Sequence, residues 1–367
     1  MSASAPLLAF NCTAYDALPS GARARAVGLA AGLLELGAAV LLFVPPGLDL
    51  RAAVAEELGA PAPEGRLLQM PTPLDPALPA LRAARSERWF RRHVPRQVDL
   101  FVTDYYPVLD EVRTALTVHD LRYMAAPGDE PRARVLWFRS MYAHVARRAP
   151  LLVVPTAQVG SECVFHLGVD AERVRVVGNA PGAAWRRAWA APPEPPRHLL
   201  WWGTAERRKR LQILLRAYAL ASDGATLPPL VLAGRGGAPD ALPEPGAELL
   251  AAGALQALGC VPDDELVALC RAAWAVLHPS RYEGFGLPVL EALSLGTPVL
   301  AAHTGAVEEV AGDAAYLLPT DDLAAWARGL RLATAGPARL PRPDAHEVAA
   351  LRARTWRASA QALLAAL

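Results

Sequence analysis

The stretch HPSRYEGFGLPVLEALSLGTPV, from His278 to Val299, decides the fold class of this 367-residue chain. An apolar run at 272–278 is typical of a buried strand, and the apolar residues at 289–295 have helical spacing. The turn Gly284-Phe285-Gly286-Leu287-Pro288 lies between these two runs. A strand, a glycine turn and a helix start bring backbone N–H groups and the positive end of a helix dipole toward an anion. The stretch therefore predicts an anion site in an α/β domain.

Two carboxylates flank this turn. Glu283 precedes it, and Glu291 follows eight residues later in the predicted helix. Carboxylates on both sides make a poor phosphate site, because like charges repel. They suit a ligand that also carries hydroxyl groups, as a sugar nucleotide does.

The composition indicates a globular protein with two domains. Its 367 residues suit two domains better than one, and 53% are hydrophobic while 20% are charged. The net charge of +1 gives no general affinity for polyanions, so we expect no nucleic-acid partner. The four cysteines show no metal-binding spacing, and we expect them to be small buried groups in a reducing compartment.

The chain shows no predicted targeting or membrane-spanning segment. Its first residues lack the basic region of a signal peptide, and no apolar run approaches ~18 residues without a charge or a breaker. We expect a cytoplasmic protein, with a peripheral position at the inner face of a membrane as an alternative.

Short apolar runs alternate with helical patterns along the whole chain, which is typical of parallel, doubly wound sheets. The segment 181–196, rich in Ala and Pro, is the predicted linker. It separates a first domain at 1–182 from a second at 197–345, and a long helical pattern at 346–367 ends the chain. Two such sheets in tandem imply a ligand cleft between the domains, at the carboxyl ends of the strands. The strands expected lie at 7–10, 38–44, 100–103, 114–118, 151–154, 174–177, 198–202, 230–233, 254–258, 273–278, 299–301 and 315–317.

The motif around Glu283 resembles the E-x7-E signature of retaining glycosyltransferases of family 4. The sequences on either side of the motif are also similar to the family, at 258–280 and 305–322. The same holds for LLWWGTAERRKRLQILLRAY at 199–218. LVLAGRGG at 230–237, LTVHDL at 116–121 and VDAERVRVVGNAP at 169–181 also match family patterns. Several signatures in the right order are specific where a single E-x7-E is weak.

The resemblance implies the GT-B fold, which has two Rossmann-like domains with a cleft between them. It also implies a C-terminal helix, at about 350–367, that packs back on the first domain. The implied activity is the transfer of a hexose, mannose or glucose, from a nucleotide diphosphate sugar to a glycan, polysaccharide or lipid-linked acceptor. Configuration is retained and no metal is required.

Arg208 and Lys209 are the cations that the resemblance assigns to the diphosphate, at the start of a predicted helix at 208–222. Cleavage of the donor leaves negative charge on the diphosphate, which two cations can neutralise without a metal. Cations at a helix N-terminus oppose its dipole, so four in a row at 207–210 indicate a function. A solvated basic helix start is the alternative. Lys209 is also the only lysine of the chain. Either a compact point charge is needed at this position, or the lysine is there by chance.

The remaining donor contacts are implied by the resemblance as well. Glu283 would contact sugar hydroxyls and stabilise positive charge at the anomeric carbon, while Glu291 would accept from the ribose hydroxyls. For Glu291 a solvated helix position is the alternative. The backbone N–H groups of the turn would meet the sugar and phosphate. These further donor-binding positions are Gly203, Gly284, Phe285, Gly286 and Leu287.

Two positions of the first domain join this set. His119 follows an apolar run and by resemblance contacts the transferred sugar or the acceptor, although a structural strand-end histidine is the alternative. Gly21 belongs to Ser20-Gly21-Ala22-Arg23, which resembles the family's glycine-rich loop. Arg23 stands where a second glycine is common, so its side chain could replace a close backbone approach to the ligand.

The run RAARSERWFRRHVPR, from Arg82 to Arg96, combines basic and aromatic residues. Such a run can dock on anionic lipid headgroups, but a solvated helix with Trp89 and Phe90 packed inward is the commoner arrangement.

Two rival functions also stay open. One is a nucleotide-sugar epimerase of the same fold, and the other is a protein that binds nucleotide sugars without catalysis.

Overall fold

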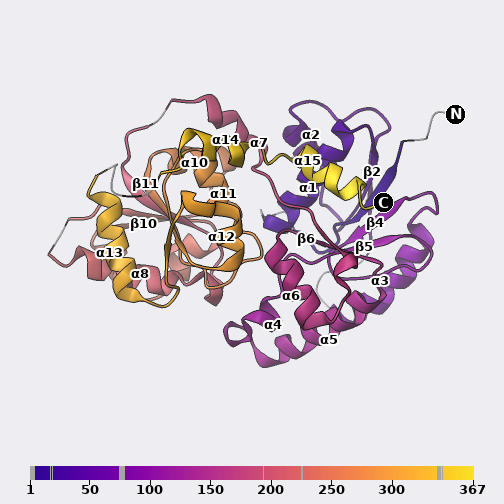
Figure 1. The fold of residues 1–367 in the computed structure, drawn as a ribbon, viewed down its shortest axis with the longest axis horizontal. Helices are drawn as coiled ribbons and strands as arrows, with labels where there is room; N and C mark the ends of the chain where they lie inside the picture. Colours follow the sequence, from indigo (N-terminus) through magenta and orange to yellow (C-terminus); the bar gives the residue numbers. More distant parts are fainter. Residues whose placement is uncertain are drawn as a thin grey trace. The chain divides into compact units, whose positions relative to one another are not determined.

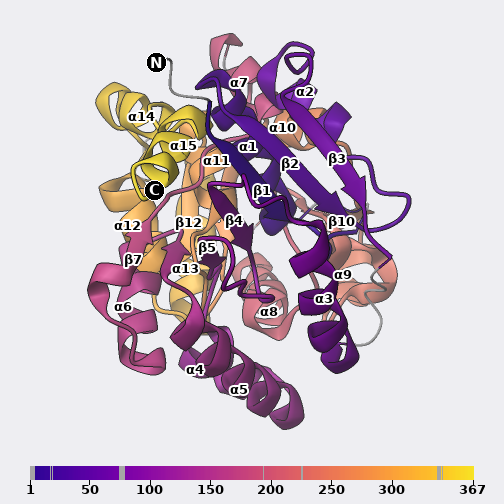
Figure 2. The same ribbon diagram turned by 90° about the vertical axis from the view of Figure 1, so that its right-hand side faces the viewer.

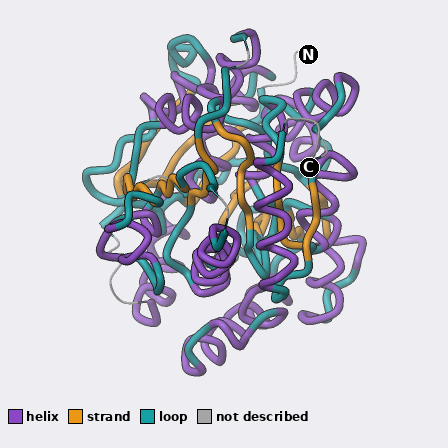
Figure 3. Tube along the Cα trace, turned by 90° about the vertical axis from the view of Figure 1, so that its left-hand side faces the viewer, coloured by secondary structure: helices purple, strands orange, loops and turns teal. Residues whose placement is uncertain are grey.

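The computed structural model describes residues 5–367 except 17, 19, 74–78, 193, 225, 337–339 and 341. The chain forms two compact units (Figure 1). Unit 1 comprises Met1–Ala183 and Arg354–Leu367, and unit 2 comprises Ala184–Ala353. The strands of the sheets, orange in Figure 3, lie inside, and the helices, purple, cover them.

Unit 1 contains a seven-stranded parallel sheet with the order β3-β2-β1-β4-β5-β6-β7. Figure 2 shows β3, β2, β1 and β4 side by side. A strand order that runs outward from β1 in both directions is that of a doubly wound sheet. The strands are β1 (Leu7–Asn11), β2 (Ala39–Val44), β3 (Leu67–Pro71), β4 (Leu100–Thr103), β5 (Thr114–Thr117), β6 (Leu151–Val154) and β7 (Val174–Val176).

Both faces of the central strands of this sheet are buried, which explains why those strands are continuous apolar runs. In β1, Leu8 and Phe10 belong to one core, and Ala9 faces another that includes Phe90. The helices of unit 1 are α1 (Gly21–Glu35), α2 (Arg51–Leu58), α3 (Pro79–His93), α4 (Arg122–Ala125), α5 (Arg132–Arg148), α6 (Ala157–Leu167) and α15 (Trp356–Leu364).

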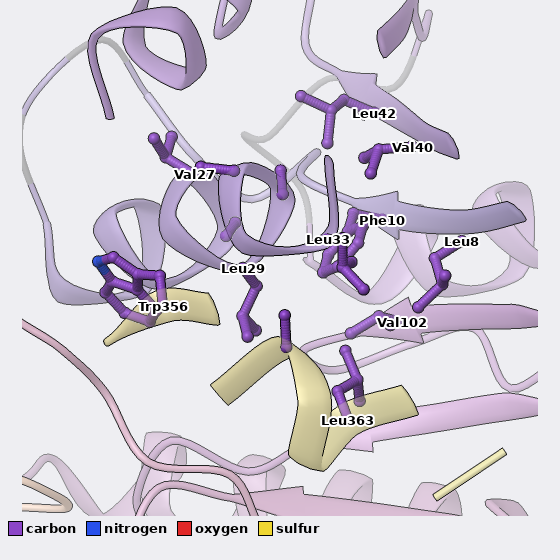
Figure 4. Packing of buried hydrophobic residues seen from close by; sticks show 14 of the residues in the cluster. Leu8, Phe10, Val27, Leu29, Leu33, Val40, Leu42, Val102, Trp356 and Leu363 are labelled. Carbon is purple, nitrogen blue, oxygen red and sulfur yellow. The ribbon is translucent and has the colours of Figure 1, made fainter. Parts of the chain in front are cut away.

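The C-terminal helix α15 packs against α1 (Figure 4), and two glycines of α1 lie at the contact. A side chain at Gly28 would collide with the indole ring of Trp356, and one at Gly32 would collide with the backbone of the same residue. Trp356 is 4% exposed and belongs to the core that holds Leu8 and Phe10. The missing side chains on α1 therefore create the notch that receives α15.

Unit 2 contains a six-stranded parallel sheet with the order β10-β9-β8-β11-β12-β13. Its strands are β8 (His198–Trp202), β9 (Leu230–Ala233), β10 (Leu255–Gly259), β11 (Ala273–His278), β12 (Val299–Ala302) and β13 (Tyr316–Leu318). Its helices are α7 (Ala183–Arg187), which begins at the last residue of unit 1, α8 (Leu211–Ser222), α9 (Gly246–Ala251), α10 (Asp263–Arg271), α11 (Leu287–Ser294), α12 (Gly305–Ala311), α13 (Leu323–Thr334) and α14 (Ala345–Arg352).

Three expectations from the sequence need correction. The predicted linker at 181–196 contains α7, and Trp185 is 3% exposed in the core of unit 2. The predicted single helix at 346–367 is two helices, because Thr355 is extended (φ −122°) and caps α15 by accepting from the N–H of Ala358. Of the four cysteines, all free, Cys260 is exposed and not buried.

Among the described residues, no helix has the length and apolar character needed to cross a bilayer.

Candidate functional site

The glycine turn of unit 2 connects the carboxyl end of β11 to the first turn of α11. Gly286 has φ 90° and ψ 50°, a left-handed conformation that glycine adopts without strain. Pro288 lies in the first turn of α11, where its lack of an N–H costs nothing. Phe285 is 7% exposed and belongs to the core, so its side chain anchors the turn. Phe285 thus holds the turn in place, and the glycines of the turn carry no side chain that would keep a ligand away from the backbone.

Glu283 lies just before this turn and contacts three cationic or potentially cationic side chains of unit 2. Its Oε1 accepts from Nζ of Lys209 at 2.6 Å, and its Oε2 accepts from Nη1 of Arg208 at 3.1 Å. Nε2 of His278, the last residue of β11, lies 3.3 Å from Oε1. The carboxylate is 9% exposed, and the Arg208 and Lys209 side chains are 11% and 13% exposed. We call these four residues the Glu283 cluster.

The Glu283 cluster shifts the proton affinities of its members in opposite directions. Burial alone raises the pKa of Glu283, but Lys209, Arg208 and His278 outweigh burial and hold its pKa well below the usual range. Burial lowers the pKa of Lys209, although Glu283 opposes that shift. Burial also lowers the pKa of His278. The carboxylate is therefore ionised across the physiological range, and it balances cations that burial would otherwise destabilise.

Arg208 and Lys209 do not lie on the long helix that the sequence predicts at 208–222. They lie on a 3-10 turn, Arg207–Lys209, and α8 begins only at Leu211. Arg210 separates the two with φ 53°, a left-handed conformation. Nε of Arg208 donates to Glu206 and its Nη1 also donates to the carbonyl of Tyr282. The separate turn directs both cations to Glu283.

Glu291 is on α11 and is not part of the Glu283 cluster. It is partly buried, and no ion pair among the described residues joins it to Arg208 or Lys209. Burial, assisted by the charge of Asp263, raises the pKa of Glu291 well above its usual value. The two glutamates of the motif therefore have opposite electrostatic environments.

Glycines also line the carboxyl ends of β8 and β9. Gly203 follows β8, and a side chain at Gly234 would lie 2.5 Å from the carbonyl oxygen of Gly203. A side chain at Gly236 would lie 2.7 Å from the ring of Trp201. Trp201 is 1% exposed beneath these glycines, so it belongs to the core, and Trp202 stacks on Trp185 with ring centroids 5.8 Å apart.

In unit 1, His119 lies two residues beyond the end of β5. Its Nε2 lies 3.1 Å from Oδ2 of Asp104, a buried residue that follows β4. The hydroxyl of Tyr15 donates to the same oxygen at 2.6 Å. Sequence reasoning missed Asp104, Tyr15 and the contact of His278 with Glu283, because a lone polar residue after a short strand has no distinctive pattern.

Gly21 opens α1, and Ser20 caps it by accepting from the N–H of Arg23 at 3.2 Å. Arg25, one turn further on, is 2% exposed. Its Nη1 donates to the side-chain oxygen of Asn179 at 2.5 Å, and burial lowers its pKa to about 10.

The basic and aromatic run between Arg82 and Arg96 is mostly helix α3. Trp89 packs edge-on against Phe43, and Phe90 is fully buried. Nη2 of Arg91 contacts Glu87 at 3.0 Å. The two aromatic residues thus serve the core, and the exposed face of the helix is charged.

No group of three or more His, Cys, Asp or Glu side chains is arranged to hold a metal ion in the described part of the chain.

Two family models match the chain in succession. Residues 19–180 match "Glycosyltransferase Family 4", and residues 185–346 match "Glycosyl transferases group 1". The O-antigen chain mannosyltransferase B of Escherichia coli is 31% identical over 222 residues, which cover 58% of each chain. The D-inositol 3-phosphate glycosyltransferase of Nocardia farcinica is 31% identical over 277 residues, or 70% of this chain and 60% of the relative. These matches span about three fifths of the relatives' length.

Solved structures share the fold over nearly the whole chain. Sucrose-phosphate synthase from Thermosynechococcus elongatus has a TM-score of 0.73 at 19% identity, with 98% of each chain covered. HepE from Anabaena, in complex with UDP and glucose, has a TM-score of 0.68 at 16% identity, again with 98% of each chain covered. The predicted GT-B architecture of two Rossmann-like domains is confirmed.

Proposed function

Because the chain belongs to family 4 of the glycosyltransferases, we propose that it transfers a hexose from a nucleotide diphosphate sugar to an acceptor. The acceptor is a glycan, a polysaccharide or a lipid-linked acceptor. Mannose and glucose are the favoured hexoses, since one relative is named as a mannosyltransferase and one solved structure of the same fold contains UDP and glucose. We propose further that the configuration of the sugar is retained.

The Glu283 cluster is the observation that carries this proposal. Arg208 and Lys209 are two poorly exposed cations on one carboxylate, next to a glycine turn at a helix start. When the sugar leaves its donor, negative charge develops on the diphosphate, and fixed cations in a site with little water stabilise that charge strongly. We propose that the two cations do this without a metal ion.

The other groups of unit 2 would hold the remaining parts of the donor. Glu283 accepts hydrogen bonds from sugar hydroxyls and stabilises positive charge at the anomeric carbon, and Glu291 accepts from the ribose hydroxyls. Backbone N–H groups from Gly284 to Leu287, together with Gly203, provide close approach for the sugar and phosphate. The opposite environments of the two glutamates support this assignment, because the ionised Glu283 suits a developing cation.

In unit 1, His119 would contact the transferred sugar or the acceptor, and Gly21 would belong to the donor site, with the Arg23 side chain in place of a close backbone approach. The charged face of α3 is the part of unit 1 that would meet anionic lipid headgroups if the acceptor is lipid-linked. Sedimentation with vesicles that contain anionic lipid tests that contact.

A screen with UDP-, GDP- and ADP-sugars tests the proposed donor site. Donor binding raises the melting temperature by mass action, and proton NMR of the anomeric signals then follows transfer to an acceptor. We expect Lys209→Ala to lose binding and transfer, and the control Arg207→Ala, which alters an exposed cation in the same turn, to keep both.

The same screen separates the rival functions. An epimerase would convert the nucleotide sugar without any acceptor. A binding protein would show the thermal shift with no hydrolysis, epimerisation or transfer on any acceptor. Full transfer by Lys209→Ala would overturn the proposed role of the Glu283 cluster.

A further inference from the structure

Asp104 lies where three neighbouring strands of unit 1 end together. β1 pairs with β4, so that Asn11 lies opposite Thr103, and β4 pairs with β5, so that Thr103 lies opposite Leu116. Because the strands are parallel, their carboxyl ends meet at one edge of the sheet. Tyr15 follows β1, Asp104 follows β4 and His119 follows β5, which explains how residues so distant in sequence meet.

Asp104 is 7% exposed, and two groups face its Oδ2 atom. The hydroxyl of Tyr15 donates to this atom at 2.6 Å, and Nε2 of His119 lies 3.1 Å from it. Burial raises the pKa of Tyr15 well above its usual value, and the charge of Asp104 adds to that rise. Tyr15 therefore keeps its proton and remains a donor to Asp104.

Other ionisable groups surround this carboxylate. Arg25 is attracted to it, while burial lowers the pKa of Arg25 to about 10, so the guanidinium stays charged at neutral pH. Cys12 has its pKa raised well above the usual value by burial and then by Asp104, and it stays neutral. Tyr105 also stays neutral, because burial and then Asp104 raise its pKa. Asp104 is thus the centre of negative charge in this cluster.

We propose that Asp104 is a positioning residue that fixes the tautomer of His119. Nε2 of His119 and Oδ2 of Asp104 are 3.1 Å apart without the alignment of a hydrogen bond. Two lone pairs at this distance repel each other, so the carboxylate favours the ring that carries its proton on Nε2. The neutral ring then has its proton on Nε2, and Nδ1 keeps a lone pair. Tyr15 supports this arrangement, because its hydroxyl holds the same carboxylate oxygen in place.

The consequence for the reaction rests on the proposed function. A neutral His119 with a free Nδ1 lone pair accepts a hydrogen bond from a sugar hydroxyl, whereas the other tautomer would present an N–H at that position. The tautomer itself does not depend on the proposed function, so it can be tested without any substrate.

Nitrogen-15 NMR of the full chain, labelled at its eight histidines, reports the tautomer directly. The signal of His119 is assigned by its loss in His119→Gln. We expect the neutral ring in the unsubstituted protein to carry its proton on Nε2, and Asp104→Asn to shift the balance toward the Nδ1–H form. Tyr15→Phe should produce a smaller shift in the same direction.

Asp120→Asn is the matched control. Asp120 adjoins His119 in sequence, but its carboxylate accepts from Arg122, through the backbone N–H at 3.2 Å and Nη1 at 3.4 Å. We expect this substitution to leave the tautomer of His119 unchanged. A proton on Nδ1 in the unsubstituted protein, or an unchanged spectrum in Asp104→Asn, would overturn the proposal.

A double-mutant cycle tests the link to catalysis. We expect Asp104→Asn to lower kcat about 10- to 100-fold, with little change in donor affinity, as for a lost contact with a charged group. In a His119→Ala background the same substitution should have almost no effect, because the two act as one unit. Equal losses in both backgrounds would show a purely structural role. If no transfer activity is found, the NMR experiment still tests the tautomer of His119 independently.

Discussion

Removal of the Glu283 charge separates two roles of this residue, the balancing of the Arg208 and Lys209 charges and the proposed stabilisation of positive charge at the anomeric carbon. In Glu283→Gln the side chain keeps its size, but Arg208 and Lys209 lose the carboxylate that they share, and Arg208 keeps its contact with Glu206. We expect this variant to bind a bare nucleoside diphosphate more tightly than the unsubstituted protein. We also expect it to lose transfer by about 100-fold or more, because Gln cannot stabilise a developing cation.

The expected gain in affinity follows from the distances. Nζ of Lys209 is 2.6 Å from Oε1 of Glu283, and a phosphate oxygen bonded to the same nitrogen would lie about 4–5 Å from Oε1. Two unit charges about 5 Å apart repel by about 3 kcal/mol at an effective dielectric constant of about 20. Because both cations keep some contact with solvent, we expect about 1–2 kcal/mol, or about 5- to 30-fold in Kd.

Isothermal titration with UDP, GDP and ADP, in matched buffers, measures this change. Glu308→Gln is the control, since Glu308 is an exposed glutamate of the same unit that contacts His303. Unchanged or weaker binding of every diphosphate by Glu283→Gln would refute the electrostatic reasoning. Transfer at the unsubstituted rate would refute the role of Glu283 toward the sugar.

Three further predictions concern the turn, the helix notch and the second glutamate. Gly286→Ala should destabilise unit 2 by about 1–2 kcal/mol in urea unfolding, since φ is 90° there, and an unchanged midpoint would contradict the left-handed turn. Gly28→Val should lower the unfolding free energy by about 1–3 kcal/mol through collision with Trp356, whereas Gly128→Ala, with open space around it, should not. Burial raises the pKa of Glu291 in the folded state, so its contribution to stability is greatest at low pH and is lost as the pH rises above its unfolded-state pKa. As the Glu291 carboxylate ionises with rising pH, nucleotide affinity, measured by titration, should rise. Glu291→Gln should abolish that rise. An identical pH profile in the variant would exclude ribose binding by Glu291.

Much of the fold follows from the sequence, because the central strands of a doubly wound sheet are buried on both faces. Leu100–Thr103 and Leu151–Val154 are fully apolar or nearly so, and each strand lies where the run predicts it. Strand β3 was missed, since it is an edge strand with half-exposed residues and a polar Gln69. The break near Thr355 was missed because alanine-rich sequence on both sides continues the helical pattern.

The candidate site was predictable where residues are close in sequence and much less so elsewhere. The turn at Gly286 follows from its own residues, and the clustering of Glu283 with Arg208 and Lys209 rested on the family resemblance. The contact between Asp104 and His119 depends on the register of β4 and β5, which no local pattern reveals. Arg25 has the same limitation, because its partner Asn179 is 154 residues away.

The central claim is that the diphosphate of the donor binds at Lys209, and this chain offers a direct measurement of it. Lys209 is the only lysine, so labelling with carbon-13 and nitrogen-15 lysine yields a single lysine spin system. We expect its signals, including the side-chain Cε, to shift saturably on titration with the nucleotide sugar that stabilises the protein. Donor binding that leaves the Lys209 signals unmoved would contradict the claim.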